Sequence, residues 1–242
     1  MALIIAYASG PKGGTGKSTD AIHSARVFAD CGLKVLVVDA DDAHTIVDVV
    51  ARGDDEHFPF DVADAVGQID QLGALRKSAD YDVVIVDLPG AKAGAFLAML
   101  AGTDGRPVAD LLVLPCRPRF IEVQPIVRAI DHEVVPAGIP YLLVLGIVHT
   151  NSVHLAEARR DELRSRELHS KPAPIVVADT IIRDFIVYDE ANELGRTVFD
   201  MPGRRSYARA AEIEQRALAR EVLSILNHPA ADKLKPPAAD KL

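Results

Sequence analysis

The chain has 242 residues, of which 49% are hydrophobic and 26% charged, a composition typical of a soluble globular protein. No apolar run approaches the roughly 18 residues of a membrane span, and the start MALIIAYAS lacks the basic region of a signal peptide. We therefore expect a cytoplasmic protein without a membrane span. The two cysteines lie far apart and form no CxxC pair, which argues against a disulfide framework or a zinc site.

The formal net charge of −8 is unevenly distributed. Residues 1–150 contain 12 basic and 20 acidic residues and residues 151–242 contain 15 of each, which together give the totals of 27 and 35. Because contacts to phosphate depend on the local field, this composition neither requires nor excludes nucleic-acid binding.

Short apolar segments alternate with segments that can form helices. The expected strands cover 3–8, 34–40, 82–88, 111–115, 141–148 and 173–179, and the expected helices cover 17–31, 91–102, 119–135, 153–168 and about 204–227. Most strand segments are rich in Val, Ile and Leu without strict alternation, as expected of strands covered on both faces. The order predicts an α/β fold, a doubly wound, mostly parallel sheet with helices on both faces. Ligands of such sheets bind beyond the carboxyl ends of the strands.

The C-terminal part of the sequence divides into a helix and a tail. The helix has apolar residues at helical spacing, among them Leu218 and Val222, so one face should pack on the body. After it the segment PAADKL occurs twice, at 229–234 and 237–242, among proline, alanine and charged residues. This composition predicts a disordered tail over 228–242 and a single domain over 1–227.

The segment GPKGGTGKST, at 10–19, lies between the first expected strand and the first expected helix. Glycines let backbone N–H groups surround phosphate oxygens, and the helix N-terminus adds a positive partial charge. We expect Lys17 to reach β- and γ-phosphates, the Ser18 hydroxyl to bind Mg²⁺ and Thr19 to donate to an α-phosphate oxygen. The usual GxxxxGK[ST] pattern is not met, because its first glycine falls on Pro11.

Acidic residues follow the next two strands. VLVVDADDAHT places Asp39 and Asp41 after the second expected strand, where a carboxylate can orient a water in line with a γ-phosphorus. YDVVIVDLPG ends its strand at Asp87, an arrangement in which a carboxylate holds Mg²⁺ through water, opposite Ser18.

Together these motifs resemble those of the ParA/MinD family of deviant Walker A ATPases, a type of P-loop NTPase. KGGTGKS matches the family's KGGxGK[ST] loop, the D-x-D matches its first switch and DLPG matches its D-x-P-G second switch. The likeness spans about residues 2–225 and is most specific in the first hundred. It implies ATP and Mg²⁺ as cofactors and a homodimer with ATP sandwiched between the subunits.

The resemblance also implies roles for single residues. Lys12 would cross the dimer interface to the nucleotide of the partner, much as an arginine finger does. Asp41 would position the attacking water, Asp39 would lie nearer the metal, and the Gly90 N–H would reach the γ-phosphate. Asp42 stands where many partition proteins have proline, which is a departure from the family pattern.

The candidate site residues form three groups. We expect Lys12, Lys17 and Asp41 to be catalytic and Ser18, Asp39 and Asp87 to serve the metal. We expect the nucleotide to be bound by Lys12, Gly13, Gly14, Thr15, Gly16, Lys17, Ser18, Thr19 and Gly90. We expect Asn151 and Thr180 to contact the adenine base, because they end the segments GIVHTN and VVADT, whose following loops should hold it.

Within this family the sequence favours a small ParA-type ATPase without an N-terminal DNA-reading domain. Two lone cysteines do not supply a bridged iron–sulfur cluster, and the tail lacks both a terminal tyrosine cluster and a basic amphipathic membrane helix. We expect an ATPase that partitions or positions a plasmid, a chromosome or another cargo. It would bind DNA non-specifically in the ATP state, and so associate with the nucleoid, until a ParB-like or cargo-bound activator stimulates hydrolysis. The alternatives are an ATP-dependent ligase of the dethiobiotin synthetase type and a MinD-like positioning ATPase on a membrane surface.

Arginines in the second half of the chain are the candidate DNA face. The segment 203–209 contains three arginines and no acidic residue, and the nearest acids, Asp200 and Glu212, lie outside it. It is therefore the strongest candidate for a DNA-binding cluster. The candidate DNA-binding residues are Arg183, Arg204, Arg205 and Arg209, with Arg159, Arg160, Arg164 and Arg166 as further basic residues on one expected helix.

Overall fold

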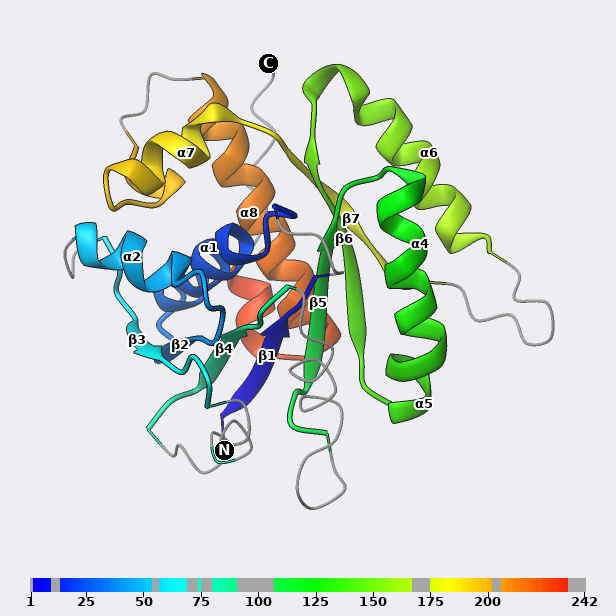
Figure 1. Ribbon diagram of the computed structural model, residues 1–242. Helices are drawn as coiled ribbons and strands as arrows, with labels where there is room; N and C mark the ends of the chain where they lie inside the picture. Colours follow the sequence, from blue (N-terminus) through cyan, green and yellow to red (C-terminus); the bar gives the residue numbers. More distant parts are fainter. Residues whose placement is uncertain are drawn as a thin grey trace.

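A computed structural model of the chain describes residues 2–9, 14–53, 57–68, 74, 80–90, 107–166, 175–201 and 206–234. Within these residues seven strands form one parallel sheet, which confirms the predicted fold class (Figure 1). The strand order is β3-β2-β4-β1-β5-β6-β7. The strands are β1 (Leu3–Tyr7), β2 (Val35–Asp39), β3 (Asp61–Asp64), β4 (Val83–Asp87), β5 (Leu111–Cys116), β6 (Tyr141–Val148) and β7 (Val177–Arg183).

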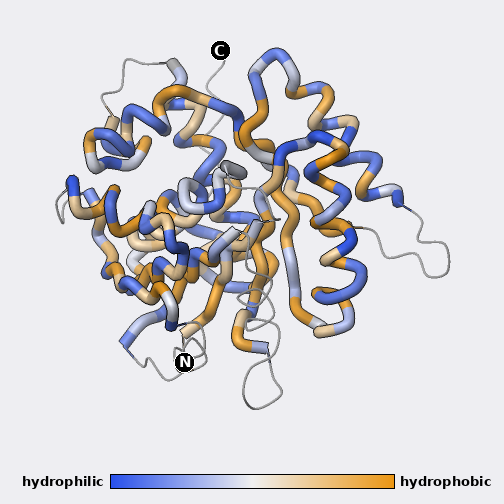
Figure 2. The backbone as a smooth tube through the Cα atoms, viewed as in Figure 1, coloured by the Kyte–Doolittle hydropathy of each residue, from blue (hydrophilic) through white to orange (hydrophobic). Residues whose placement is uncertain are grey.

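The central strands are buried on both faces. In β1, Ile5 and Tyr7 belong to one cluster of buried side chains, whereas Ile4 and Ala6 belong to a second cluster. Figure 2 shows the same strands as largely hydrophobic along their length. This two-sided burial explains why their sequences are continuous apolar runs rather than alternating ones.

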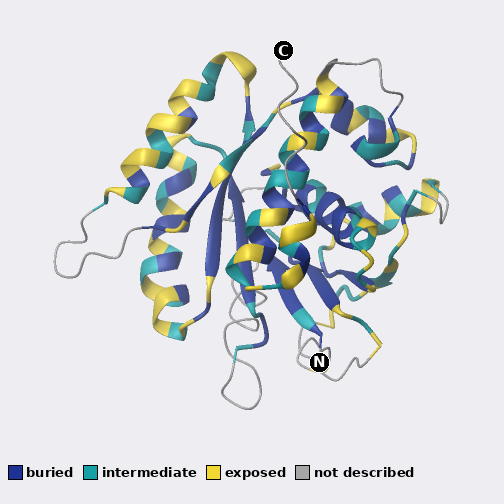
Figure 3. Ribbon diagram, turned by 180° about the vertical axis from the view of Figure 1, so that it is seen from behind, coloured by how far each residue is buried: buried dark blue, intermediate teal, exposed yellow. Residues whose placement is uncertain are grey.

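Helices cover both faces of the sheet. The first cluster receives side chains from α1 (Lys17–Asp30), α2 (Thr45–Arg52), α7 (Ile186–Glu193) and α8 (Ser206–Ile225), and the second from α4 (Phe120–Ala129) and α6 (Val153–Arg164). A π-helical turn at Ile130–Val134 joins α4 to α5 (Val135–Ala137). Figure 3 shows the strands as buried and the helices with their outer surfaces exposed. No helix in the described part of the chain is both long and apolar enough to span a membrane.

The sequence does not predict three of these elements. The four-residue strand β3, at the edge of the sheet, has the sequence DVAD and is only half-buried, so it lacks an apolar run. The helices α2 and α7 have eight residues each, too few for a clear helical period. The helix expected over 91–102 lies outside the described residues.

The last strand begins later than expected. The prediction of a strand over 173–179 was wrong in its bounds, because β7 starts at Val177 and ends at Arg183. Its pairing with β6 shifts register between Val177 and Ile181. An edge strand with such an irregularity can accommodate the polar residues Asp179 and Thr180, which a central strand of this sheet would not.

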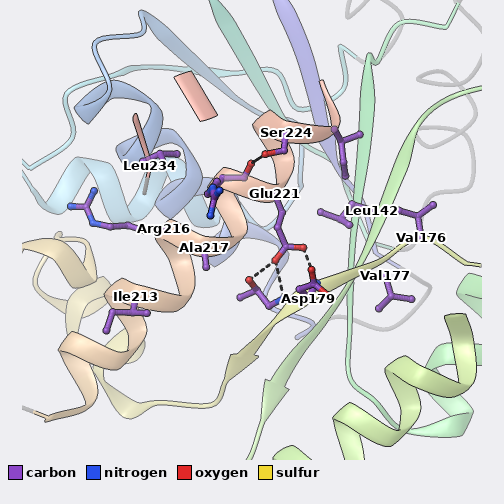
Figure 4. A pocket seen from close by; sticks show the side chains of 13 residues that line it. Leu142, Val176, Val177, Asp179, Ile213, Arg216, Ala217, Glu221, Ser224 and Leu234 are labelled. Carbon is purple, nitrogen blue, oxygen red and sulfur yellow. Dashed lines mark hydrogen bonds between the residues drawn. The ribbon is translucent and has the colours of Figure 1, made fainter. Parts of the chain in front are cut away.

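Side chains form hydrogen bonds with the backbone groups of the irregular part of β7. Glu221 of α8 accepts hydrogen bonds from the backbone N–H groups of Asp179 (2.7 Å) and Thr180 (2.8 Å) and from the Thr180 hydroxyl (2.5 Å), as Figure 4 shows. From α6, Arg160 donates to the carbonyl oxygen of Asp179 at 2.7 Å. Since an open strand edge can pair with another chain, these bonds protect the edge of the sheet.

The C-terminal segment differs in part from the expected tail. Pro229–Lys233 form a short 3₁₀ helix next to α8, and Ala230 and Leu234 are buried in the first cluster. Lys233 Nζ donates to the carbonyl oxygen of Cys31 at 3.1 Å. The first copy of PAADKL therefore packs on the body of the protein, and residues 235–242 lie outside the described part.

A buried polar network joins α1 to α8. Gln215 Nε2 donates to Asp20 Oδ1 (2.9 Å) and to the Tyr188 hydroxyl (3.2 Å). The other oxygen of Asp20, Oδ2, is buried and has no hydrogen-bond partner among the described residues. Burial raises the pKa of Asp20 to about 7, although the bond from Gln215 favours the ionised form.

Replacing Asp20 with Asn should stabilise the protein above neutral pH and have little effect near pH 4. In the unfolded chain the carboxyl ionises near its ordinary pKa of 3.8, and in the folded protein near 7. The protonated acid therefore contributes stability that is lost as the pH rises through this window. Asparagine does not ionise, so the gain at pH 8 should be about 4 kcal/mol, which corresponds to a difference of about 3 in the pKa between the two states.

Urea unfolding at pH 5, 6, 7 and 8 measures this difference. The control is Glu157→Gln, which removes an exposed carboxylate from α6. If Asp20→Asn and the unaltered protein lost stability in parallel as the pH rises, burial of Asp20 would not be the cause.

Candidate functional site

Two acidic residues lie side by side at the carboxyl ends of β2 and β4. Asp39 ends β2, Asp87 ends β4, and the two are directly paired in the parallel ladder. On the other side of β4, β1 leads into the glycine loop that precedes α1. The parallel direction of the strands thus brings the loop and both carboxylates to one edge of the sheet, toward the top of Figure 1.

The described part of the glycine loop opens onto a cavity. Gly14 (φ 72°) and Gly16 (φ 88°) have left-handed backbone conformations, which residues with a side chain rarely adopt. Lys12 and Gly13 lie outside the described residues. The cavity has a volume of about 440 Å³ and is lined by Ser9, Gly14, Thr15, Gly16, Lys17, Ser18, Thr19, Asp41, Asp42, Ala43, Thr45, Pro89 and Gly90.

Lys17 connects three segments at this cavity. Its Nζ lies 2.5 Å from Asp87 Oδ1 and 3.0 Å from Asp41 Oδ2. Ser18 Oγ donates to the other oxygen of Asp87 at 2.6 Å. The side chains of Lys17 and Asp87 are only 7% and 0% exposed, so the pair is shielded from water. The start of α1 is therefore held to the end of β4 and to the loop after β2.

The two carboxylates at Lys17 have different acidities. Burial raises the pKa of Asp87 to about 6, although Lys17 favours its ionised form. Burial acts in the same direction on Asp41, but hydrogen bonds from Lys17 and from backbone N–H groups, including that of Gly90, outweigh it, so the pKa of Asp41 lies below its ordinary value. Asp41 is thus ionised at neutral pH and links the loop after β2 to the loop after β4.

The carboxylate of Asp39 accepts hydrogen bonds from backbone N–H groups. Its Oδ2 accepts hydrogen bonds from the N–H groups of Ile46 (3.0 Å) and Val47 (3.2 Å), and its Oδ1 accepts one from Asp41 (3.1 Å). Asp39 therefore holds the start of α2 and the backbone of Asp41 in place. Of the residues expected at a metal, Ser18 and Asp87 remain as those whose polar atoms meet beside the cavity.

Ser18 and Asp87 fit a magnesium ion that is bound mainly through other ligands. No group of three or more His, Cys, Asp or Glu side chains that could hold a metal occurs among the described residues. Magnesium at phosphate sites takes one or two protein oxygens and completes its shell with phosphate oxygens and water. A serine hydroxyl 2.6 Å from a carboxylate oxygen is a donor set of that kind.

The two residues expected at a base lie in different places. Asn151 is exposed in the 3₁₀ turn Thr150–Ser152, directly after β6 and hence at the carboxyl edge. Thr180 lies inside β7 and donates a hydrogen bond to Glu221 in the pocket between β7 and α8. Because β7 continues to Arg183, the residue that follows the strand at the carboxyl edge is Asp184.

A second cavity, of about 610 Å³, lies where β5 and β6 end. Its lining includes Arg117, Phe120, His149, Arg159 and Asp184. Sequence analysis missed Arg117, although a charged residue directly after the buried segment LLVLPC carries the same signal as Asp39 and Asp87.

The candidate DNA-binding arginines that the structure describes are paired with carboxylates. Arg183 donates to Glu214, and Arg209 lies 3.0 Å from Glu212. Arg204 and Arg205 lie outside the described residues. The arginines of the α6 region are paired as well, in Arg159–Glu162, Arg160–Asp161, Arg164–Asp179 and Arg166–Asp131.

A known protein family and several solved structures are similar to this chain. A family described as the CobQ/CobB/MinD/ParA nucleotide binding domain matches residues 6–198. The solved structure of the cell division ATPase MinD of Pyrococcus furiosus has a TM-score of 0.67 at 20% identity, over 93% of this chain and 100% of that one. No curated protein sequence matches the chain.

Two further solved structures share the fold. A putative plasmid partition protein of Borrelia burgdorferi bound to AMPPNP has a TM-score of 0.63 at 14% identity, over 94% of this chain and 99% of that one. The ParA of pNOB8, bound to nonspecific DNA, has a TM-score of 0.58 at 16% identity over the same shares of the two chains, 94% and 99%.

Replacing Lys17 with Met should destabilise the protein even without a ligand. The change leaves the fully buried Asp87 without its cation, and breaking a buried ion pair from one side costs about 3 kcal/mol. Thermal unfolding at pH 8 measures this loss. Adding Asp87→Asn to Lys17→Met should recover much of it, because the unpaired charge is then gone. A Lys17→Met protein as stable as the unaltered one at pH 8 would contradict the ion pair.

Proposed function

The chain belongs to the CobQ/CobB/MinD/ParA family of nucleotide-binding domains, and we propose that it is an ATP-dependent, dimerising ATPase that partitions or positions DNA or another cargo. In this proposal the ATPase domain covers residues 1–227. ATP and Mg²⁺ are the cofactors, and hydrolysis resets the switch.

One observation carries the ATPase assignment. Lys17, the second lysine of the sequence KGGTGKS and the first residue of α1, lies within hydrogen-bonding distance of Asp87 and Asp41 at the edge of a 440 Å³ cavity. A cation on a glycine loop at a helix N-terminus is suited to a phosphate chain. The adjoining hydroxyl and carboxylates are suited to a magnesium ion and a water nucleophile.

We propose that binding of the nucleotide releases Asp41. The phosphate chain offers Lys17 several charged oxygens, so it replaces the contact with Asp41, whose side chain is 20% exposed and able to move. Asp41, ionised because of its depressed pKa, then accepts a hydrogen bond from a water facing the γ-phosphorus. The Gly90 N–H, which bonds Asp41 in the free protein, becomes available to the phosphate.

Ser18 and Asp87 are the residues that would hold Mg²⁺, whose charge stabilises the phosphate oxygens. Asp87 keeps its bond from Ser18, so the end of β4 stays joined to α1 when Lys17 turns to the phosphates. Asp39 keeps the loop after β2 in place through its three backbone bonds.

We propose that the ATP-bound form is a homodimer in which Lys12 reaches the phosphates of the partner's nucleotide. The support is the KGGTGKS sequence, in which Lys12 is a second lysine on the phosphate loop. A second positive charge from the partner would make dimerisation depend on the triphosphate.

We propose that the ATP-bound form binds DNA without sequence preference and therefore associates with the nucleoid. Two proteins that share the fold are a ParA bound to nonspecific DNA and a putative plasmid partition protein. The candidate contacts are Arg183, Arg204, Arg205 and Arg209. Because Arg183 and Arg209 are paired with acids, each copy should bind DNA weakly, and stable binding should need two copies side by side. A DNA- or cargo-bound activator would then stimulate hydrolysis and release.

A MinD-like positioning role on another surface is the second candidate. It is favoured by the TM-score of 0.67 with MinD of Pyrococcus furiosus. A ligase of the dethiobiotin synthetase type is disfavoured by Lys12, which such ligases generally lack.

Replacing Lys12 with Gln should abolish dimerisation with ATP and leave nucleotide binding by the monomer nearly unchanged. The lost charge acts on the nucleotide of the partner, so only the assembled form is affected. Light scattering after size-exclusion chromatography measures the mass, and a fluorescent ATP analogue measures binding. The exposed Lys34→Gln is the matched control. A Lys12→Gln dimer of normal affinity would refute the assignment of Lys12.

Fluorescence anisotropy of a random-sequence duplex should show binding with ATP and not with ADP or without nucleotide. Asp41→Ala should strengthen it, because the ATP form is no longer hydrolysed. Raising salt from 50 to 200 mM should weaken it by roughly tenfold or more, as phosphate contacts require. Joint replacement of Arg204, Arg205 and Arg209 with Ala should abolish binding, while the control Arg128→Ala should not. An ATP dimer that binds no DNA would favour the second candidate.

A further inference from the structure

Arg117 lies beside the glycine loop. It directly follows Cys116, the last residue of β5, and β5 is the neighbour of β1, the strand that leads into the loop. A Cβ atom placed on Gly14 would lie 3.9 Å from Arg117 Nη2. The guanidinium therefore lies near the loop on the β5 side, while Lys17 lines the cavity from α1.

The charge on Arg117 has no anionic partner in the part of the chain that the structure describes. Its Nε is buried and makes no hydrogen bond, and none of the described carboxylates forms an ion pair with it. Such partners are present, in contrast, at six arginines considered for the DNA face, namely Arg159, Arg160, Arg164, Arg166, Arg183 and Arg209. Burying a donor without an acceptor is unfavourable, so an arginine at this place is best explained by an acceptor that arrives with a ligand.

The position of Arg117 limits what that ligand can be. The guanidinium borders both the glycine loop and the second cavity, and a group that binds it on the loop side lies near Gly14, on the loop whose other end is held by Lys17. A polyphosphate is the anion that fits between two such cations. The planar fork of arginine matches phosphate oxygens with two parallel hydrogen bonds, which a lysine in its place would not provide.

We propose that Arg117 binds the phosphate chain of the nucleotide in its own subunit. This assignment rests on the proposed nucleotide-binding function and adds to it a residue that the sequence motifs do not include. Arg117 clamps the chain from the β5 side of the loop and Lys17 from the α1 side.

Replacing Arg117 with Gln tests this contact. Titration calorimetry should show that the affinity for ATP and for inorganic tripolyphosphate falls by the same factor, about 10- to 100-fold, because both carry the phosphate chain. Arg117→Lys should keep the charge and lose only part of the affinity. The matched control is Arg119→Gln, two residues away, exposed and likewise without a carboxylate partner among the described residues.

Thermal unfolding gives a second readout, in which the variant should be at least as stable as the unaltered protein without ligand but gain less stability from ATP. Without ligand, Arg117→Gln should be as stable as the unaltered protein or more stable, because an unpaired charge is removed. With saturating ATP the rise in Tm should be smaller than for the unaltered protein, since the ligand binds less tightly. A variant that simply unfolds would lose stability in both conditions.

Three outcomes would each contradict one part of this proposal. If Arg117→Gln binds ATP as tightly as the unaltered protein, Arg117 does not contact the nucleotide. If ATP is affected and tripolyphosphate is not, Arg117 contacts the base or ribose, and the phosphate assignment is wrong. If the unaltered protein binds tripolyphosphate but no nucleotide, the proposed function fails while an anion site at Arg117 stands.

Discussion

The site depends on the neutralisation of one buried ammonium group. Lys17 is almost fully buried, and a charge in that position is stable only with counter-charges close by. Asp87 and Asp41 supply them from the ends of two neighbouring strands, β4 and β2. Two chain segments that are far from α1 in the sequence are thereby drawn to its first turn. The walls of the cavity are therefore held in place by ion pairs within the chain itself.

The same need for counter-charges identifies arginines whose charge serves the fold. Arg164 donates to the carbonyl oxygen of Val177 (2.6 Å) and to Asp179 (2.7 Å), so it holds α6 to the edge strand β7. Arg160 and Glu221 satisfy other backbone groups of the same edge. These charges belong to the fold, and a net count of basic residues overstates what is left for a polyanion. Arg117 differs, because its buried Nε has no acceptor among the described residues.

The sequence predicts the part of the structure that is determined locally. The strands β1, β2 and β4 are continuous apolar runs, and each ends in the loop or acid that the phosphate motif requires, so their residues can be read from the chain. Thr180 could not be placed, because the register of β7 depends on Glu221, 41 residues away. The packing of Leu234 likewise depends on a surface made by distant elements, which composition does not reveal. The proximity of Arg117 to Gly14 follows from strand order, since β5 lies next to β1 only in the folded sheet.

Burial of Asp20 bears on the same loop. Its unpaired Oδ2 lies 3.9 Å from the position that a Cβ of Gly16 would take, so an ionised Asp20 would place a negative charge directly behind the loop. Because burial raises its pKa to about 7, the carboxyl is largely neutral below that pH and partly ionised above it. A phosphate at the loop and a charged Asp20 disfavour each other, and linkage makes the effect of each on the other equal. In the proposed nucleotide complex, the acid that ties α1 to α8 would therefore also contribute to the electrostatic potential at Lys17 and Arg117.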